Sequence, residues 1–573
     1  MGAPCVLASR PPASASRRAI ILKRVLSLVA LACSAAVRVF ALVLVSSAVV
    51  AAGSAQATAT QKSQAVPGEA VFLVSGRGWG HGVGMSQYGA YGMANEGASY
   101  AKILAYFYTG TQLGKTSMSE VRVLLAEGRR ALTISSPLPY RVTDADGVTT
   151  KLPAGPIVLK PKLKLPTATG PVAAVSPVVF TPGKAPLSLD GRLYRGKLEA
   201  SVQGSFLRAV NTVQMESYLQ GVVAGEMPHT WPAEALKAQA VAARSYTLAN
   251  LVKGKSFDLY PDQRSQVYVG LSGEKPETSA AVRATAGQVV LYGGRVASTL
   301  YFSSSGGKTA SSADVFGVAV PYLVSKPDPW DRLSPYHRWG PIVVGARTIQ
   351  SKLDVPARVL DASGVPTPSG RLRAVTLETT AGATSVPAAL LRTALELRST
   401  WVSIGVLRLD RPPDPAVFGS QVELSGLARG LQTPTLSSSK DGVSWRTVGP
   451  LQRSTGGAFA AAVRPTATTR YRIEVKGAAS PGLLVPVASR VRLAQPALDP
   501  TSLSGMVRPK LSGAAVSIER LKGTAWTPVA STAVDGAGSF RARVKLVPGS
   551  YRARVAATNG LAEGISPPLT VTE

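Results

Sequence analysis

One carboxylate lies on an otherwise apolar helical stripe of this 573-residue chain. Met215, Leu219, Val222 and Glu226 recur at helical spacing, which predicts a helix with Glu226 on its apolar face, and Pro228 ends that helix just beyond it. Burial and the negative end of the helix dipole both disfavour the charged carboxylate, so both should raise the pKa of Glu226. A carboxyl group that keeps its proton near neutral pH can act as a general acid. The alternative is a glutamate at a helix end that pairs with a nearby cation.

Arg244 is the candidate for that cation. It lies on a second predicted helix, which begins near Trp231 and is rich in alanine, and it follows the apolar letters "AVAA". Small residues allow close packing, so Lys237 and Arg244, on one line of this helix, could face a shared cleft. We expect Lys237 to be a solvated surface residue, whereas the apolar surroundings of Arg244, with the aromatic Tyr246 beside it, favour a buried role.

A run of hydroxyls precedes two glycines in "YFSSSGGKT". Ser303, Ser304 and Ser305, followed by Gly306 and Gly307, could offer hydroxyls and bare backbone amides to a polar ligand. The spacing is not that of a phosphate-binding P-loop, and the chain has no G-x-S-x-G nucleophile elbow.

Glycine occupies every second position from residue 76 to residue 84, in "GRGWGHGVG". Arg77, Trp79, His81 and Val83 fill the gaps. In an extended segment this spacing leaves one face as bare backbone. We therefore expect something to come very close to that face, either a ligand or, if the glycines only serve packing, the alanine-rich helix.

Metal and thiol chemistry have little support in the sequence. The three histidines, His81, His229 and His337, show no paired-ligand spacing. Both cysteines, Cys5 and Cys33, fall within the first 57 residues, which leaves no thiol for a disulfide or a zinc site in the rest of the chain. We expect no metal and no cofactor.

The first 57 residues read as a secretory signal peptide. Basic residues precede the apolar run "VFALVLVSSAVVAAG", and Ala55-Gln56-Ala57 fits the A-x-A cleavage pattern, so the mature chain is expected to start near Thr58. A membrane association is expected only if the signal is not cleaved. This segment holds six basic residues and no acid, so the rest of the chain carries +25 of the total +31 charge. Such a charge favours anionic wall polymers, ahead of nucleic acid, as partners of an exported bacterial protein.

The C-terminal part repeats itself. The letters "GVSWRTV" at residues 442–448 match "GTAWTPV" at 523–529. Phe459 and Phe540 lie at the same distance after the tryptophan of their own segment, and Tyr471 and Tyr551 lie at nearly the same distance. A period near 80 residues fits small β-sandwich domains, each built around a buried tryptophan. These aromatics are expected to be core residues, and a wall-binding role is the alternative.

Four separated motifs resemble the SpoIID/LytB family of bacterial peptidoglycan-acting proteins. They are "GRGWGHGVGMSQYGAYGMANEGASYAKILAYFYTGT", "YLQGVVAGEMPHTWPAEALKAQAVAARSYTL", "YFSSSGGKTASSADVF" and "LELRSTWVSI", and together they cover most of residues 71–404. In many relatives the glycine motif closes the domain, whereas here it opens the mature chain, so the order is permuted. A permuted segment can occupy the same place if the ends of the domain are adjacent.

The resemblance implies site residues. The catalytic glutamate of the family falls on Glu226, and its arginine and its Ser-Gly loop fall on Arg244 and on Ser303 to Gly307, which with Tyr246 become candidate substrate contacts. A sugar ring could stack on Trp79 or Tyr88 and bring its polar edge to the glycine amides, with His81 and Gln87 as hydrogen-bonding groups.

The resemblance also implies a reaction. Hydrolysis of a glycosidic bond normally uses two carboxylates, and the sequence offers one strong candidate, with Glu216 a weak second. A lytic transglycosylase needs only one, since the sugar's own C6 hydroxyl attacks the anomeric carbon. The alternatives are a non-catalytic wall protein that stimulates a separate amidase and, more remotely, an extracellular nucleic-acid binder.

The expected fold class is α+β for residues 58–405, a mixed and β-rich SpoIID/LytB-like catalytic domain with a few helices. Two small all-β immunoglobulin-like sandwiches are expected to follow, at residues 406–494 and 495–573. Two helices are predicted near the start, at about 85–95 and at 99–110 with Ser99 as the cap, and the expected location is the cell wall outside the cytoplasm.

Overall fold

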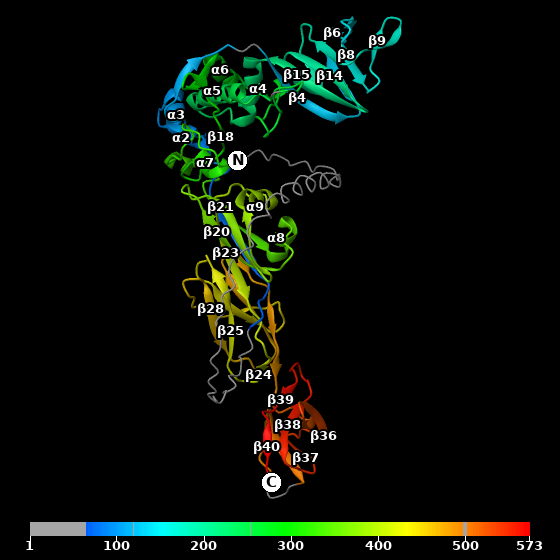
Figure 1. Ribbon diagram of the computed structural model, residues 1–573, viewed down its shortest axis with the longest axis vertical. Helices are drawn as coiled ribbons and strands as arrows, with labels where there is room; N and C mark the ends of the chain where they lie inside the picture. The colour runs from blue at the N-terminus through cyan, green and yellow to red at the C-terminus, as the bar shows by residue number, and fades with distance from the viewer. Residues whose placement is uncertain (1–64, 118–119, 253, 497–500, 573) are drawn as a thin grey trace, which may run out of the picture. The chain divides into compact units, whose positions relative to one another are not determined.

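The computed structural model describes residues 65–117, 120–252, 254–496 and 501–572 (Figure 1). The signal peptide predicted at residues 1–57 lies outside the described residues. Among those described, no helix is both long and apolar enough to cross a membrane. The chain is rich in short strands with a few helices, as the sequence predicts.

The helices lie in the first two thirds of the described chain. They are α2 (Gln87–Asn95), α3 (Tyr100–Phe107), α4 (Met215–Glu226), α5 (Ala233–Ala249), α6 (Pro276–Ala284), α7 (Ser312–Phe316), α8 (Ala346–Leu353) and α9 (Ala388–Ala394). Short 3-10 turns lie at Leu271–Gly273 and Pro329–Leu333. The predicted break between α4 and α5 at Pro228 is confirmed, and Ser99 caps α3 by accepting a hydrogen bond from the amide of Lys102.

Two antiparallel sheets lead into α4. The first has the strand order β4-β15-β14-β11-β6-β7 and the second β13-β12-β5-β8, and both contribute to one buried apolar cluster. Their strands are β4 (Glu120–Arg129), β5 (Leu132–Ser136), β6 (Tyr140–Thr143), β7 (Thr149–Leu152), β8 (Gly155–Leu159), β11 (Val178–Thr181), β12 (Leu187–Leu189), β13 (Arg192–Tyr194), β14 (Lys197–Gln203) and β15 (Phe206–Gln214). Strand β15 passes directly into α4, so the sheet fixes where that helix starts.

Helices α4, α5 and α6 gather at the end of β15 (Figure 1). Helix α5 is almost entirely buried, because its many alanines let neighbouring helices come close. Short strands complete this region: β2 (Met85–Ser86) pairs in parallel with β18 (Tyr301–Phe302), and β3 (Gln112–Lys115) pairs with β16 (Gln288–Tyr292), which also pairs with β17 (Arg295–Val296). Helix α2 therefore starts beside residues 301–302.

The opening strand joins residues far along the chain. Strand β1 (Val71–Gly76) lies between β19 (Trp339–Gly345) and β23 (Val402–Leu409) in the order β19-β1-β23-β25-β28, with Gly76 opposite Val402. The two ends of the region that carries the permuted motifs are therefore adjacent in the fold. Strands β25 (Val422–Arg429) and β28 (Ala458–Val463) extend the same sheet, and β20 (Val359–Pro366), β21 (Leu372–Thr379) and β22 (Gly382–Pro387) form a separate one. The domain boundary predicted after residue 405 falls inside β23.

The glycine stretch is not an extended strand beyond β1. Gly78, Gly80, Gly82 and Gly84 all have positive φ, which extended backbone does not have, so the segment turns repeatedly. The chain itself covers the bare positions. A Cβ on Gly82 would lie 2.4 Å from the Arg371 guanidinium, and the others meet residues 300–306. The expected close approach is confirmed, but at these positions the partner is protein, and it is not the alanine-rich helix.

The remaining described strands are β9 (Lys164–Thr167), β10 (Gly170–Ala173), β24 (Ala416–Val417), β26 (Thr435–Ser439), β27 (Arg446–Pro450), β29 (Thr469–Val475), β30 (Ala478–Ala479), β31 (Leu483–Val485), β32 (Val487–Ala488), β33 (Arg490–Leu493), β34 (Ser502–Arg508), β35 (Ala515–Lys522), β36 (Ala525–Ala533), β37 (Ser539–Arg543), β38 (Gly549–Val555), β39 (Gly564–Ile565) and β40 (Leu569–Val571). Described residues from 402 onward form strands and no helix.

The sequence repeat is also a structural repeat. Phe459 pairs with Gly426 across β25 and β28, and Phe540 pairs with Gly505 across β34 and β37, with both phenylalanines buried. The prediction of a buried tryptophan in each unit is wrong. Trp445 is half-buried under Arg472, and Trp526 is half-buried under Arg552.

Candidate functional site

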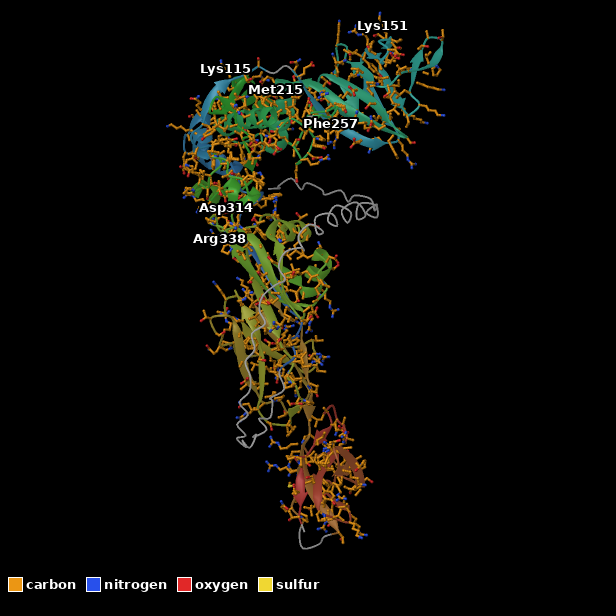
Figure 2. All side chains as sticks on the ribbon, in the orientation of Figure 1. Lys115, Lys151, Met215, Phe257, Asp314 and Arg338 are labelled. Atoms are coloured by element: carbon orange, nitrogen blue, oxygen red, sulfur yellow. The ribbon has the colours of Figure 1, made fainter. Side chains whose placement is uncertain are left out.

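The carboxyl group of Glu226 lies at the last turn of α4, whose first residue, Met215, is labelled in Figure 2. The backbone amide of Val267 donates a 2.7 Å hydrogen bond to Oε1 of Glu226. Among the described residues, no lysine, arginine or histidine forms an ion pair with it. The loop before α6 thus fixes the direction of the carboxyl group without neutralising it.

Burial raises the pKa of Glu226 above its ordinary value. The hydrogen bond from Val267 and the side chains of Tyr301 and Gln87 act in the opposite direction and do not cancel this effect. The sequence prediction of a raised pKa is therefore confirmed in direction. A carboxyl group in this state can donate a proton at a higher pH than a free glutamic acid can.

Polar side chains from three elements surround Glu226. Gln87, the first residue of α2, donates to the backbone carbonyl of Glu226 at 3.1 Å and lies 3.4 Å from Oε1 of Gln239. The hydroxyl of Tyr301 donates to Oε1 of Gln266 at 2.9 Å. The Tyr246 ring lies 6.3 Å from the Tyr301 ring. The structure therefore places Gln87 beside Glu226. Burial raises the pKa of the Tyr246 hydroxyl, and Tyr246 lies near enough for the charge of Glu226 to raise that pKa further. Contact of either residue with a substrate stays a prediction.

Three aromatic rings lie next to this network. The Tyr88 ring is 4.9 Å from the Trp231 ring, and the Tyr91 ring is 4.7 Å from it. Tyr88 and Tyr91 stand on α2, whereas Trp231 comes from the loop between α4 and α5 that follows Glu226. Aromatic faces of this kind can stack on sugar rings. Only Tyr88 was predicted from the sequence.

Arg244 takes a different partner. Its guanidinium donates to both carboxylate oxygens of Glu216, at 2.9 and 2.6 Å, and to the backbone carbonyl of Gln288 at 2.9 Å. Glu216 and Glu226 are ten residues apart on α4, roughly 15 Å along the axis at about 1.5 Å per residue. The alternative in which Arg244 pairs with Glu226 is therefore wrong. A role for Arg244 in substrate contact stays a prediction. Its guanidinium N–H groups already donate to Glu216 and to the Gln288 carbonyl.

The hydroxyl and glycine loop binds a buried carboxylate of its own chain. Asp331 accepts hydrogen bonds from the hydroxyl of Ser304 at 2.8 Å and from the amides of Ser305 and Gly306 at 2.6 and 2.8 Å. Gly307 donates its amide to the Ser305 hydroxyl at 3.0 Å. The loop is thus an anion-binding turn, as its residue types indicate, but the anion is Asp331. Contact of these residues with a substrate stays a prediction.

His81 is held by backbone groups at both ring nitrogens. Nδ1 lies 3.1 Å from the amide of Val83, and Nε2 lies 3.1 Å from the carbonyl of Tyr301. An amide can only donate and a carbonyl can only accept, so the ring is neutral with its proton on Nε2. Burial lowers the pKa of His81 to about 4, consistent with this assignment. In this arrangement, His81 supports Tyr301, and its ring nitrogens are not free for a ligand.

Trp79 is the most accessible of the predicted aromatics, with 40% of its surface exposed. Its ring makes an edge contact with Tyr336 at 4.5 Å, and the Arg398 guanidinium lies over both rings. Ser303 is connected to α2, since its carbonyl accepts the amide of Tyr88 at 3.0 Å.

Sequence reasoning missed Tyr301, Gln266 and the Val267 amide. Tyr301 begins the quoted "YFSSSGG" motif, so its place beside the serines was a usable signal. A backbone amide has no residue-type signal, and Gln266 lies in a loop without periodicity. Among the described residues, no group of three His, Cys, Asp or Glu side chains could hold a metal ion.

Residues 203–292 match the family model described as stage II sporulation protein, SpoIID. This segment contains Glu226, Arg244 and Tyr246. The resemblance to the SpoIID/LytB family is thereby confirmed for this segment.

Curated relatives align with about a quarter of the chain. A Bacillus subtilis protein named amidase enhancer is 41% identical over 148 residues, covering 25% of this chain and 20% of its own. Stage II sporulation protein D of the same organism is 34% identical over 148 residues, covering 23% and 43%. An uncharacterized protein of Brachyspira hyodysenteriae is 39% identical over 139 residues, covering 24% and 38%. The chain thus spans less than half the length of these relatives.

Among solved structures, a segment of two fibronectin type III domains from chicken tenascin covers 29% of this chain and 95% of its own, at 19% identity and a TM-score of 0.18. A score this low does not bear on the fold.

Proposed function

We propose that the protein is a lytic transglycosylase that cleaves the β-1,4 bond between N-acetylmuramic acid and N-acetylglucosamine in peptidoglycan. The observation that carries the proposal is the state of one carboxyl group. Burial raises the pKa of Glu226, the Val267 amide holds its Oε1, and no cation among the described residues pairs with it. The match of residues 203–292 to the SpoIID family model supports a role at the cell wall.

One such carboxyl group is enough for this reaction. Glu226 donates its proton to the glycosidic oxygen as the bond from that oxygen to the anomeric carbon breaks. The C6 hydroxyl of the muramic acid then attacks the same carbon and gives its proton to the Glu226 carboxylate. The products are a free 4-hydroxyl end and a 1,6-anhydro end, and the glutamic acid is restored.

Neighbouring groups support these two proton transfers. The Val267 amide stabilises the carboxylate that forms after the first transfer. This hydrogen bond lowers the pKa of Glu226 and so offsets part of the rise that burial causes. The rings of Tyr88 and Tyr91 on α2 and of Trp231 in the loop after Glu226 offer apolar faces for sugars. Glu216 does not supply a second catalytic carboxylate, because Arg244 holds both of its oxygens.

The test is the formation of anhydro ends from purified glycan strands, measured by mass spectrometry. Glu226→Gln keeps the shape of the side chain and removes the transferable proton, so the rate should fall at least about 100-fold. The matched control is Glu378→Gln, which changes an exposed glutamate on β21 that forms no ion pair with a described residue. Equal activity of Glu226→Gln and wild type would refute the role of Glu226.

A second candidate function is stimulation of a separate wall amidase. The relative named amidase enhancer favours it. In this case the protein binds the wall and forms no new sugar ends, while a wall amidase releases more peptide in its presence. The variant Glu226→Gln separates the two functions, because it should abolish cleavage and leave pure stimulation intact.

We further propose that the protein acts outside the cytoplasm at the cell wall. The predicted signal peptide and the +25 charge of the remaining chain support this location. Its proposed partners are glycan strands, anionic wall polymers and a wall amidase.

A further inference from the structure

A cavity of about 380 Å³ opens on the sheet that contains β1, β19 and β23. Residues of all three strands and of the turns next to them line it: Ser75, Gly76, Arg77, Arg338, Trp339, Gly340, Trp401 and Ser403. We call it the arginine pocket. It contains none of the residues assigned to the Glu226 site, and its volume lies in the lower part of the range for small-ligand sites.

Two guanidinium groups of the arginine pocket have no acidic partner. Neither Arg77 nor Arg338, which is labelled in Figure 2, forms an ion pair with any described residue, and no carboxylate lines the cavity. Arg244, by contrast, donates to both carboxylate oxygens of Glu216. Two unpaired guanidiniums that share one cavity provide a positive field for an anion.

The backbone holds Arg77 firmly in place. Its amide donates to the carbonyl of Trp401 at 2.9 Å, and its carbonyl accepts the Ser399 hydroxyl at 2.6 Å. The Arg77 guanidinium lies 5.4 Å from the centre of the Trp401 ring, and the buried Arg371 guanidinium lies 5.2 Å from the same ring. Two positively charged guanidinium groups therefore lie near the same indole ring, and a bound anion would reduce the repulsion between them.

The composition of the arginine pocket favours a phosphate group over a carboxylate. One arginine fork satisfies a carboxylate, which has two oxygens in a plane. Two guanidiniums and the hydroxyls of Ser75 and Ser403 can serve the three or four oxygens of a tetrahedral phosphate. The indoles of Trp339 and Trp401 add apolar surface for the alcohol part of an ester.

We propose that the arginine pocket binds the phosphate ester of a polyanion, and that it does so independently of the chemistry at Glu226. The +25 charge predicted for the chain after its signal peptide is suited to a polymeric anion. A single phosphate ester would occupy the pocket, and the surrounding positive charge would hold the rest of the polymer.

The experiment measures binding to the full chain by calorimetry at fixed ionic strength. The probes are inorganic phosphate, glycerol 3-phosphate, poly(glycerol phosphate) and, as a carboxylate of equal charge, polyglutamate. The double variant Arg77→Gln with Arg338→Gln should bind poly(glycerol phosphate) at least tenfold more weakly than wild type. Glycerol 3-phosphate should bind more tightly than inorganic phosphate, because only the ester reaches the indoles.

Two controls separate the pocket from total charge and from folding. Arg141→Gln with Arg373→Gln removes the same charge from exposed residues that form no ion pair with a described residue, and it should change affinity less than twofold. Arg77→Lys keeps the charge without the fork and should recover part of the affinity, with an unchanged melting temperature. Equal losses in both double variants, or tighter binding of polyglutamate than of poly(glycerol phosphate), would overturn the proposal. Tighter binding of inorganic phosphate than of the ester would do so too.

Discussion

The backbone amide of Val267 and the carboxyl group of Glu226 are joined by a 2.7 Å hydrogen bond, although 41 residues separate them in sequence. This bond and burial have opposite effects on the pKa of Glu226, and burial prevails. The direction of that shift determines how both activity and stability should depend on pH.

The first prediction concerns pH. The folded protein holds the Glu226 proton more tightly than the unfolded chain does, so stability is lost as pH rises from the unfolded pKa through the raised folded one. Glu226→Gln does not titrate and should lack this loss. Chemical denaturation at pH 4 and pH 8 should therefore show the variant gaining stability relative to wild type at the higher pH.

In wild type, glycan cleavage should decline on the alkaline side as the acid ionises. A stability difference that stays constant with pH would show that burial does not govern this group.

The second prediction tests the pair Glu216 and Arg244. Arg244 is only 1% exposed, whereas the Glu216 side chain is 37% exposed, so Glu216→Gln leaves a buried guanidinium without its carboxylate and should lower the free energy of unfolding by about 1 to 3 kcal/mol. Glycan cleavage per folded molecule should change less than threefold, because the pair lies at the other end of α4. Denaturant titration and a rate assay at low temperature provide the two readouts. A large rise in KM with unchanged stability would instead assign the pair of Glu216 and Arg244 to substrate binding.

These two glutamates illustrate what the sequence could predict. Helical periodicity placed both on α4 and put Glu226 at its end, because the register of a helix is a local property. The partner of Arg244 depends on how α4 and α5 cross, which no local pattern encodes. The Val267 amide comes from a loop and Asp331 from the short 3-10 turn Pro329–Leu333, so tertiary packing brings both to their places.

Some parts of the fold could be predicted from the sequence and others could not. Periodicity predicts helices α4 and α5, the capping residue predicts the start of α3 at Ser99, and self-similarity predicts the repeat of Phe459 and Phe540. The pairing of β1 with β23 joins segments more than 300 residues apart, and the glycine pattern indicated only that something approaches closely. Alternating glycines suit an extended strand as well as a series of positive-φ turns, so that prediction erred.

A third prediction compares two glycines with similar φ angles. Gly82 has φ of +90° and a Cβ there would meet the Arg371 guanidinium at 2.4 Å, whereas Gly97 has φ of +84° and nothing within 4 Å. Gly97→Ala should lower the free energy of unfolding by about 1 kcal/mol, because it adds only the strain of a left-handed backbone. Gly82→Ala adds a steric clash with Arg371 and should lower the free energy of unfolding by about 1 to 3 kcal/mol more. Thermal and denaturant unfolding measure both variants. Equal costs would mean that Arg371 moves aside freely.

The fourth prediction concerns His81. Its neutral Nε2-protonated form should persist down to pH near 5, since burial lowers its pKa to about 4. Nitrogen-15 spectra of the imidazole can follow the tautomer directly. Between the ordinary pKa of 6.5 and this lowered value, the unfolded chain binds more protons, so His81 should make stability fall as pH falls through that window. Titration of His81 near pH 6.5 would contradict the two backbone hydrogen bonds.

The last prediction concerns where the chain can be divided. A fragment of residues 58–410 keeps β23 but removes β25 and β28, which continue the same sheet, and it exposes Leu407 and Leu409 from a shared apolar cluster. An unpaired apolar edge of this kind promotes aggregation. A fragment of residues 58–489 retains those strands. We expect the shorter fragment to melt at a lower temperature and to aggregate at micromolar concentration, and the longer one to remain monomeric and to keep its activity on short glycans. Light scattering and thermal melts compare the two. If the shorter fragment proves equally stable and active, β23 does not need its C-terminal neighbours, and the division after residue 405 predicted from the sequence is the functional one.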